Sequence, residues 1–264
     1  RGIGGRSALD YLIKVKGYSF LEAVETIIGH TAIQAPVYEK PQSKEENKPL
    51  LLPEKCASNR VITEYLFGRG IDFEIINYCI SNDLIFESLP YHNVVFVGYD
   101  EKKEPKYAAY RSTNKRRIMG DCSGSKKDYS FRLGKENLEE VHLFECAIDL
   151  LSYATLAKLN GQDWKEMSFV SLSGVYSPAK KIEDSKVPIA LEKYLGSNPS
   201  VRKIRIHFDN DIAGRKAAQT LKTILPDKYE IVDEPPKAGK DFNDFLCMRM
   251  GIYNKKTHER NEER

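Results

Sequence analysis

Acidic side chains stand at the ends of two apolar segments in the second half of the chain. Glu145 ends the first segment, and Asp149 follows it by about one helical turn. Asp209 and Asp211 end the second segment, and residues two apart in an extended strand project to the same side. Carboxylate oxygens in this pattern suit Mg²⁺ or Mn²⁺. We expect Asp209, Asp211 and Asp149 to be metal ligands, with Glu145 beside them.

Taken singly, these carboxylates have ordinary structural explanations. Asp211 precedes an expected helix, and aspartate is strongly preferred as an N-cap residue. A lone glutamate at the end of a strand usually pairs with a nearby lysine or arginine. Only the ordered combination of the four carboxylates points to a metal site.

The segments around these carboxylates alternate between strand and helix patterns. Strands are predicted at 141–145, 169–172, 204–208 and 229–232, and helices at 150–158, 189–195 and 213–225. Such alternation is typical of an α/β domain with a mainly parallel sheet. Ligands bind at the carboxyl edge of such sheets, which is where the acidic residues fall.

The preceding part of the chain has a different pattern. Residues 58–80 predict two helices, and the hydrophobic period then changes to two, so that 93–99 and 105–111 predict a strand hairpin. The predicted fold class is therefore α+β overall. A basic antiparallel α+β domain is followed by an α/β domain with a mainly parallel sheet.

Positive charge is concentrated on this predicted hairpin and the residues after it. Between residues 101 and 135 eleven Lys or Arg stand against four acidic residues, a net charge of +7, whereas the whole chain carries +3. Aromatic residues alternate with the cations, and such a mixture can stack bases while the cations meet phosphates. The alternative is that half of these aromatics belong to the core. Phosphate contacts are expected from Arg111, Arg116, Arg117, Lys126 and Lys127.

Three motifs occur in order along the second half. They are Glu145-Cys146-Ala147-Ile148-Asp149, then Asp209-Asn210-Asp211 followed by Ala213-Gly214, then Lys240-Asp241-Phe242-Asn243-Asp244. This set resembles the Toprim domain shared by bacterial primases, type IA and type II topoisomerases and several nucleases. The resemblance implies that Glu145 is a general acid or base and that Asp209 and Asp211 coordinate Mg²⁺ or Mn²⁺. We also expect Lys240 to contact nucleic acid or nucleotide. Cys146 stands where primases usually have Gly.

Further stretches place the chain near the primases within that family. Residues 213–218 and 240–246 resemble primase sequences, and residues 4–24 resemble the end of a primase zinc-ribbon domain whose metal ligands are absent here. The stretch 65–71 resembles the domain before Toprim in primase-like proteins of plasmids and integrative mobile elements. The predicted domains are 1–29 (zinc-ribbon remnant), 30–55 (linker), 56–138 (basic domain), 139–253 (Toprim domain) and 254–264 (polar tail).

These features predict a primase-like nucleotidyltransferase that works with Mg²⁺ or Mn²⁺ in mobile-element replication or transfer. Its partners would be single-stranded DNA as template and nucleoside triphosphates, with a helicase or relaxase as protein partner. A metal-dependent Toprim nuclease and a non-catalytic nucleic-acid-binding module are the alternatives, because the same carboxylates serve either phosphoryl-transfer reaction. A topoisomerase is not expected, since no domain with a cleavage tyrosine is recognisable.

Cysteine usage and hydropathy limit the setting of the protein. The five cysteines are widely spaced and form no Cys-x-x-Cys pair, which argues against a disulfide framework and a zinc site and favours a reducing cytoplasm. No apolar run reaches membrane-spanning length, and no signal peptide opens the chain. Because the first residue is Arg1, we expect a fragment of a longer protein.

Overall fold

The computed structural model describes residues 8–18, 20–28, 48–114, 116, 118–174, 176, 178–179 and 181–252. The chain divides into two units, residues 1–46 and 47–264. In the first unit, α1 (Ala8–Lys14) contacts α2 (Phe20–Ile28). Both helices fall in the segment predicted as a zinc-ribbon remnant. Residues 1–7, most of the predicted linker and the whole polar tail lie outside the described residues.

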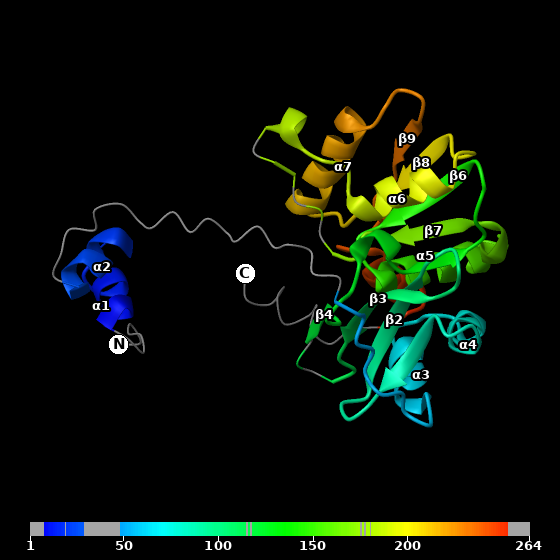
Figure 1. Ribbon diagram of the computed structural model, residues 1–264, viewed down its shortest axis with the longest axis horizontal. Coiled ribbons are helices and arrows are strands. Elements are labelled where there is room, and N and C mark those ends of the chain that lie inside the picture. Colours follow the sequence, from blue (N-terminus) through cyan, green and yellow to red (C-terminus); the bar gives the residue numbers. More distant parts are fainter. Residues whose placement is uncertain are drawn as a thin grey trace. The chain divides into compact units, whose positions relative to one another are not determined.

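The second unit begins with two helices and a four-stranded antiparallel sheet (Figure 1). Its elements are α3 (Arg60–Phe67), α4 (Phe73–Ser81), β1 (Ile85–Ser88), β2 (Asn93–Tyr99), β3 (Pro105–Arg111) and β4 (Met119–Asp121), with the strands in sequence order across the sheet. The predicted hairpin of 93–99 and 105–111 is confirmed as β2 and β3. β1 was not predicted because its four residues, two apolar followed by two polar, show no alternation.

A second sheet of five strands follows. It consists of β5 (Arg132–Gly134), β6 (Glu140–Phe144), β7 (Ser168–Ser171), β8 (Lys203–Ile206) and β9 (Glu230–Asp233), in the spatial order β5-β7-β6-β8-β9. β5 is antiparallel to β7, and the other neighbours are parallel. The predicted mainly parallel sheet and the α+β fold class are confirmed.

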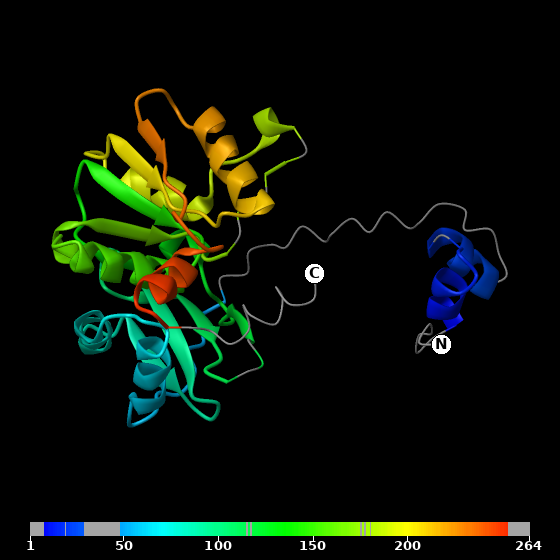
Figure 2. The same ribbon diagram turned by 180° about the vertical axis from the view of Figure 1, so that it is seen from behind.

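Helices cover both faces of this sheet. They are α5 (Ala147–Leu159), α6 (Ile189–Ser197), α7 (Ile212–Ile224) and α8 (Phe242–Arg249), with short 3₁₀ helices at Lys127–Tyr129, Trp164–Glu166 and Ile182–Asp184. Successive β6 residues face opposite sides: Leu143 joins a core with α6 and α7, and Phe144 joins a core with α5 and α8. Figure 2 shows α8, in red, beside α5. No helix within the described ranges is long and apolar enough to cross a membrane.

The two sheets are joined through a shared core. The cluster that contains Phe144 also contains buried side chains from α3 and α4, such as Leu66 and Ile76. Polar contacts reinforce it, because the Asp72 amide donates to Thr155 Oγ1 at 3.1 Å and Lys158 pairs with Asp72 at 2.7 Å. The antiparallel half therefore packs directly on α5, the helix that follows Glu145.

Candidate metal centre

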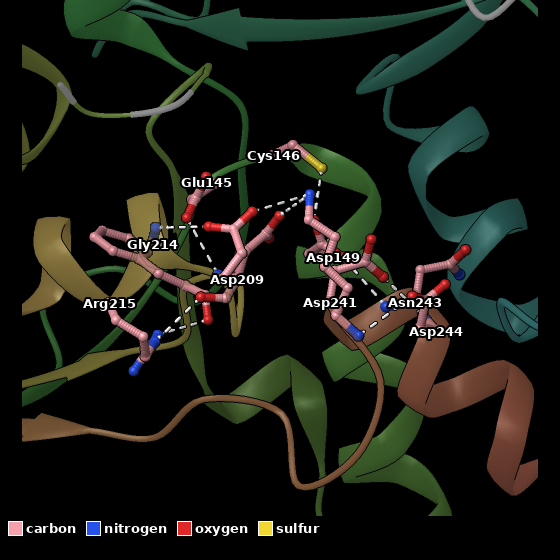
Figure 3. Close-up of polar contacts among 12 residues, drawn as sticks. Glu145, Cys146, Asp149, Asp209, Gly214, Arg215, Asp241, Asn243 and Asp244 are labelled. Carbon is pink, nitrogen blue, oxygen red and sulfur yellow. Dashed lines mark hydrogen bonds and ion pairs between the residues drawn. The ribbon is translucent and has the colours of Figure 1, made fainter. Parts of the chain in front are cut away.

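Glu145 and Asp209 meet at the carboxyl ends of the neighbouring parallel strands β6 and β8. The Asp209 amide donates a hydrogen bond to Glu145 Oε1 at 3.1 Å (Figure 3). Gly214, in the first turn of α7, permits this approach, since a Cβ there would lie 2.2 Å from the Asp209 carbonyl oxygen and 2.9 Å from Glu145 Oε1. Glu145 and Asp209 thus lie together at the carboxyl edge of the sheet.

Asp211 has the N-cap role that its sequence position suggested, and its second carboxylate oxygen faces Lys240. Its Oδ1 accepts a hydrogen bond from the Gly214 amide at 2.9 Å, so it is the N-cap of α7. Its Oδ2 lies 3.3 Å from the Lys240 ammonium, which is also 2.9 Å from Asp209 Oδ2. The N-cap role therefore leaves one Asp211 oxygen facing the same cation as Asp209.

Burial and mutual repulsion dominate the electrostatics of this group. Burial, followed by the charge of Asp209, raises the pKa of Glu145 to about 7. Burial also raises the pKa of Asp209, whereas the Gly214 amide lowers that of Asp211. The Lys240 ammonium partly offsets this charge and marks where a positive charge is stabilised. A donor set of carboxylate oxygens around that point fits Mg²⁺ or Mn²⁺.

Arg215 supports the loop that carries Asp209, and the sequence analysis gave it no role. Its guanidinium donates to the carbonyl oxygens of Asp209 at 3.2 Å and Phe208 at 2.8 Å. It also pairs with Asp233, at the end of β9, at 2.7 Å. The only signal in the sequence was its place directly after Ala213-Gly214, which does not reveal that it binds two backbone oxygens after β8 and the Asp233 carboxylate of β9.

Asp149 belongs to a separate hydrogen-bond network, visible on the other side of Figure 3. Its two carboxylate oxygens accept from Cys146 Sγ at 2.9 Å and from the Asn243 amide at 3.2 Å. The Asn243 side chain donates in turn to Ser152 Oγ and to the Arg69 carbonyl oxygen. This network fastens α8 to α5. The metal role expected for Asp149 stays a prediction, and the contacts described are structural.

The predicted cationic residues separate into different places. Arg111 and Lys127 line a hollow of about 290 Å³, and Cys146, next to Glu145, also lines it. Arg111 Nε donates to the Tyr65 hydroxyl at 3.0 Å, and Lys127 pairs with Asp121 at 3.0 Å. Arg111 and Lys127 therefore share a hollow with Cys146, the residue that follows Glu145.

Other predicted contacts are farther away or outside the described residues. Arg116 is exposed and lines a separate hollow, Lys126 is exposed, and Arg117 lies outside the described residues. Lys240, expected to contact nucleic acid or nucleotide, pairs with the two aspartates. Among the aromatics, Tyr107 and Phe131 are buried, so for these two the core explanation holds.

Two protein-family models match separate parts of the chain. Residues 142–246 match the model of the Toprim-like family, and residues 64–137 match a family described as a protein of unknown function (DUF3991). The second half of the chain is therefore a Toprim-like domain. A comparison with curated proteins gave no match.

Solved structures with a similar fold include three primases. The primase fragment of the bacteriophage T7 primase-helicase protein is 18% identical, with 70% of this chain and 69% of that chain covered and a TM-score of 0.47. A DNA primase domain from Pseudomonas aeruginosa is 15% identical, with coverage of 73% and 68% and a TM-score of 0.46. The zinc-binding and RNA polymerase domains of the Aquifex aeolicus primase are 15% identical, with coverage of 94% and 68% and a TM-score of 0.44.

Proposed function

We propose that this protein is a primase-like nucleotidyltransferase that joins nucleotides on a single-stranded DNA template, using Mg²⁺ or Mn²⁺, during replication or transfer of a mobile element. The observation that carries the proposal is the convergence of Glu145, Asp209 and Asp211 at one sheet edge, next to a hollow lined by cations. Nucleoside triphosphates and single-stranded DNA would be its ligands, and a helicase or relaxase its protein partner in the cytoplasm.

Each carboxylate has a distinct part in this proposal. Asp209 and the Oδ2 of Asp211 would hold the metal, which when bound stabilises charge on the reacting phosphate and lowers the pKa of the attacking hydroxyl. Glu145 Oε1 is occupied by the Asp209 amide, which leaves Oε2 to take or give a proton. A glutamate whose pKa burial raises towards neutrality suits that task.

Lys240 links the metal site to the nucleotide. Its ammonium contacts the same two aspartates that would hold the metal, so a divalent cation must displace it. The displaced side chain, which is half exposed, would then meet a phosphate oxygen of the substrate. This accounts for a lysine in a motif of acidic residues and keeps its expected nucleotide contact.

The cationic hollow favours synthesis over cleavage. Polymerisation needs a second phosphate-binding surface for the incoming triphosphate, and Arg111 and Lys127 offer one beside Cys146. Tyr110 lines the same hollow and offers a face for a base. A nuclease needs only one strand held across the metal, and would leave this second cationic surface without a role.

The test uses the full-length native protein with single-stranded DNA, labelled ribonucleotides and Mg²⁺ or Mn²⁺. We expect labelled oligonucleotides that disappear in Glu145→Gln. Glu140→Gln is the matched control, because Glu140 lies at the opposite end of the same strand and should leave synthesis intact. A shortened template without labelled product, again lost in Glu145→Gln, would establish the nuclease instead. DNA binding without either reaction would establish a non-catalytic binding module.

A further inference from the structure

Three side chains of metal-binding type meet at one end of the antiparallel sheet, away from the Toprim-like domain. Cys56, Glu87 and His92 each offer one ligand atom, and these atoms lie within 4.8 Å of one another. In the part of the chain that the structure describes, no other group of three such side chains meets this criterion. Spacing in the sequence could not predict the group, because the chain brings its members together only by folding.

The backbone around the cluster is tied together from three segments. The Cys56 amide donates to the Glu87 carbonyl oxygen at 2.7 Å, and the Leu89 amide donates to the Glu54 carbonyl oxygen at 2.8 Å. The segment before α3 therefore runs along β1. His92 has a φ of 51°, a left-handed conformation uncommon for residues other than glycine. Its carbonyl oxygen is held by Thr113 Oγ1 at 3.0 Å. This turn points the imidazole back at Glu87.

Glu87 is the fixed point of the cluster. It is 2% exposed, and its Oε2 accepts from the amides of Val61 at 2.9 Å and Ile62 at 3.2 Å, in the first turn of α3. Its Oε1 is left facing His92 Nδ1, 2.6 Å away. An orientation imposed by outer hydrogen bonds is characteristic of metal-binding carboxylates.

We propose that Cys56, Glu87 and His92 bind one Zn²⁺, with water as the fourth ligand. A thiolate, an imidazole and a carboxylate together suit zinc, whereas Mg²⁺ prefers oxygen ligands alone. Zinc bond lengths place neighbouring ligand atoms roughly 3.3–3.7 Å apart in a tetrahedron, so the His92–Glu87 contact must open by about 1 Å. The His92 side chain is 46% exposed and Cys56 is partly exposed, which gives the metal a path to the site.

The ordinary explanation is an isolated His92–Glu87 hydrogen bond. That explanation accounts for two of the three side chains and gives Cys56 no part. Zinc would instead clamp the segment before α3, the end of β1 and the turn of His92 to one another. Ser88, Leu89 and Tyr91, which lie between Glu87 and His92 in the sequence, line a hollow of about 700 Å³ that Arg116 also lines. The metal would thus fix one wall of this hollow.

Cobalt titration of the full 264-residue chain tests the proposal, because a cobalt–thiolate bond gives a near-ultraviolet charge-transfer band. We expect one equivalent of Co²⁺ to produce the band and Zn²⁺ to abolish it. Cys56→Ser and His92→Gln should each remove the band. Cys122→Ser is the matched control, since Cys122 is also partly exposed but lies outside the cluster, and it should keep the band.

The Toprim site is tested separately in the same experiment. The double variant Asp209→Asn, Asp211→Asn should keep the cobalt band, so failure of the zinc site and failure of the proposed catalytic site are distinguishable. Glu87→Gln is not used, because Glu87 also caps α3 and its loss endangers the fold. A titration without a thiolate band, or a band that survives Cys56→Ser, would overturn the zinc site.

Discussion

Replacing Gly214 with alanine tests how tightly the carboxylate loops are packed. In an ordinary helix this change stabilises the protein by up to about 1 kcal/mol, because glycine is the poorer helix former. Here the new Cβ would lie 2.2 Å from the Asp209 carbonyl oxygen and 2.9 Å from Glu145 Oε1. The first contact is with backbone, which cannot rotate away, and overpacking of this kind costs about 1–3 kcal/mol. We expect a net loss of about 1 kcal/mol.

Urea denaturation of two matched variants measures this effect. Gly196→Ala is the control, because Gly196 also lies in a helix but its added Cβ meets nothing within 4 Å. We expect Gly196→Ala to raise the free energy of unfolding and Gly214→Ala to lower it. Mn²⁺ affinity should also fall in Gly214→Ala, since Asp209 must move. Equal stabilisation by both substitutions would refute the close approach at the metal centre.

Three further outcomes are expected. The double variant Asp209→Asn, Asp211→Asn should lose Mn²⁺ binding in titration calorimetry, and an affinity equal to that of the native protein would contradict the ligand assignment. Arg116→Ala should reduce the log–log salt slope of single-strand binding by roughly 0.7, and an unchanged slope would make Arg116 merely solvated. Glu140→Gln should cost about 1 kcal/mol above pH 5, a value that allows for solvent screening, because the hydrogen bond to His142 lowers the Glu140 pKa to about 2. That cost should shrink as the pH falls below 4.5 towards 2, and a pH-independent cost in urea titrations would count against it.

The sequence was most informative where a hydrophobic period ran over several residues. The hairpin strands at 93–99 and 105–111 were predicted with the bounds they have, because each spans seven residues. β4 and β5 have three residues each, too few to show a period. The motif at residues 240–244 overlaps the start of α8, but no helix was predicted there. The burial of α8 depends on packing against α5 and the Arg69 loop, which the local sequence does not show.

Within the site, the sequence pattern predicted which residues end the strands, but it did not predict the individual side-chain contacts. Glu145 and Asp209 were each predicted to end a strand of the parallel sheet, and the structure adds that these strands, β6 and β8, are neighbours. The contact of Lys240 with both aspartates depends on the path of the loop before α8. The local sequence pattern does not predict that path. Asp149 was grouped with the metal ligands from its place in the motif, and its partners are Cys146, the N-cap of its own helix α5, and Asn243 in α8.

The pairing of β5 with β7 has a consequence for where the chain can be cut. β5 precedes the predicted domain boundary at residue 139, yet it completes the sheet of the Toprim-like domain. A gene fragment that started at that boundary would leave β7 as a bare edge strand, which invites association with other chains. A chain cut at the apparent boundary would therefore be more prone to aggregate than one that keeps β5.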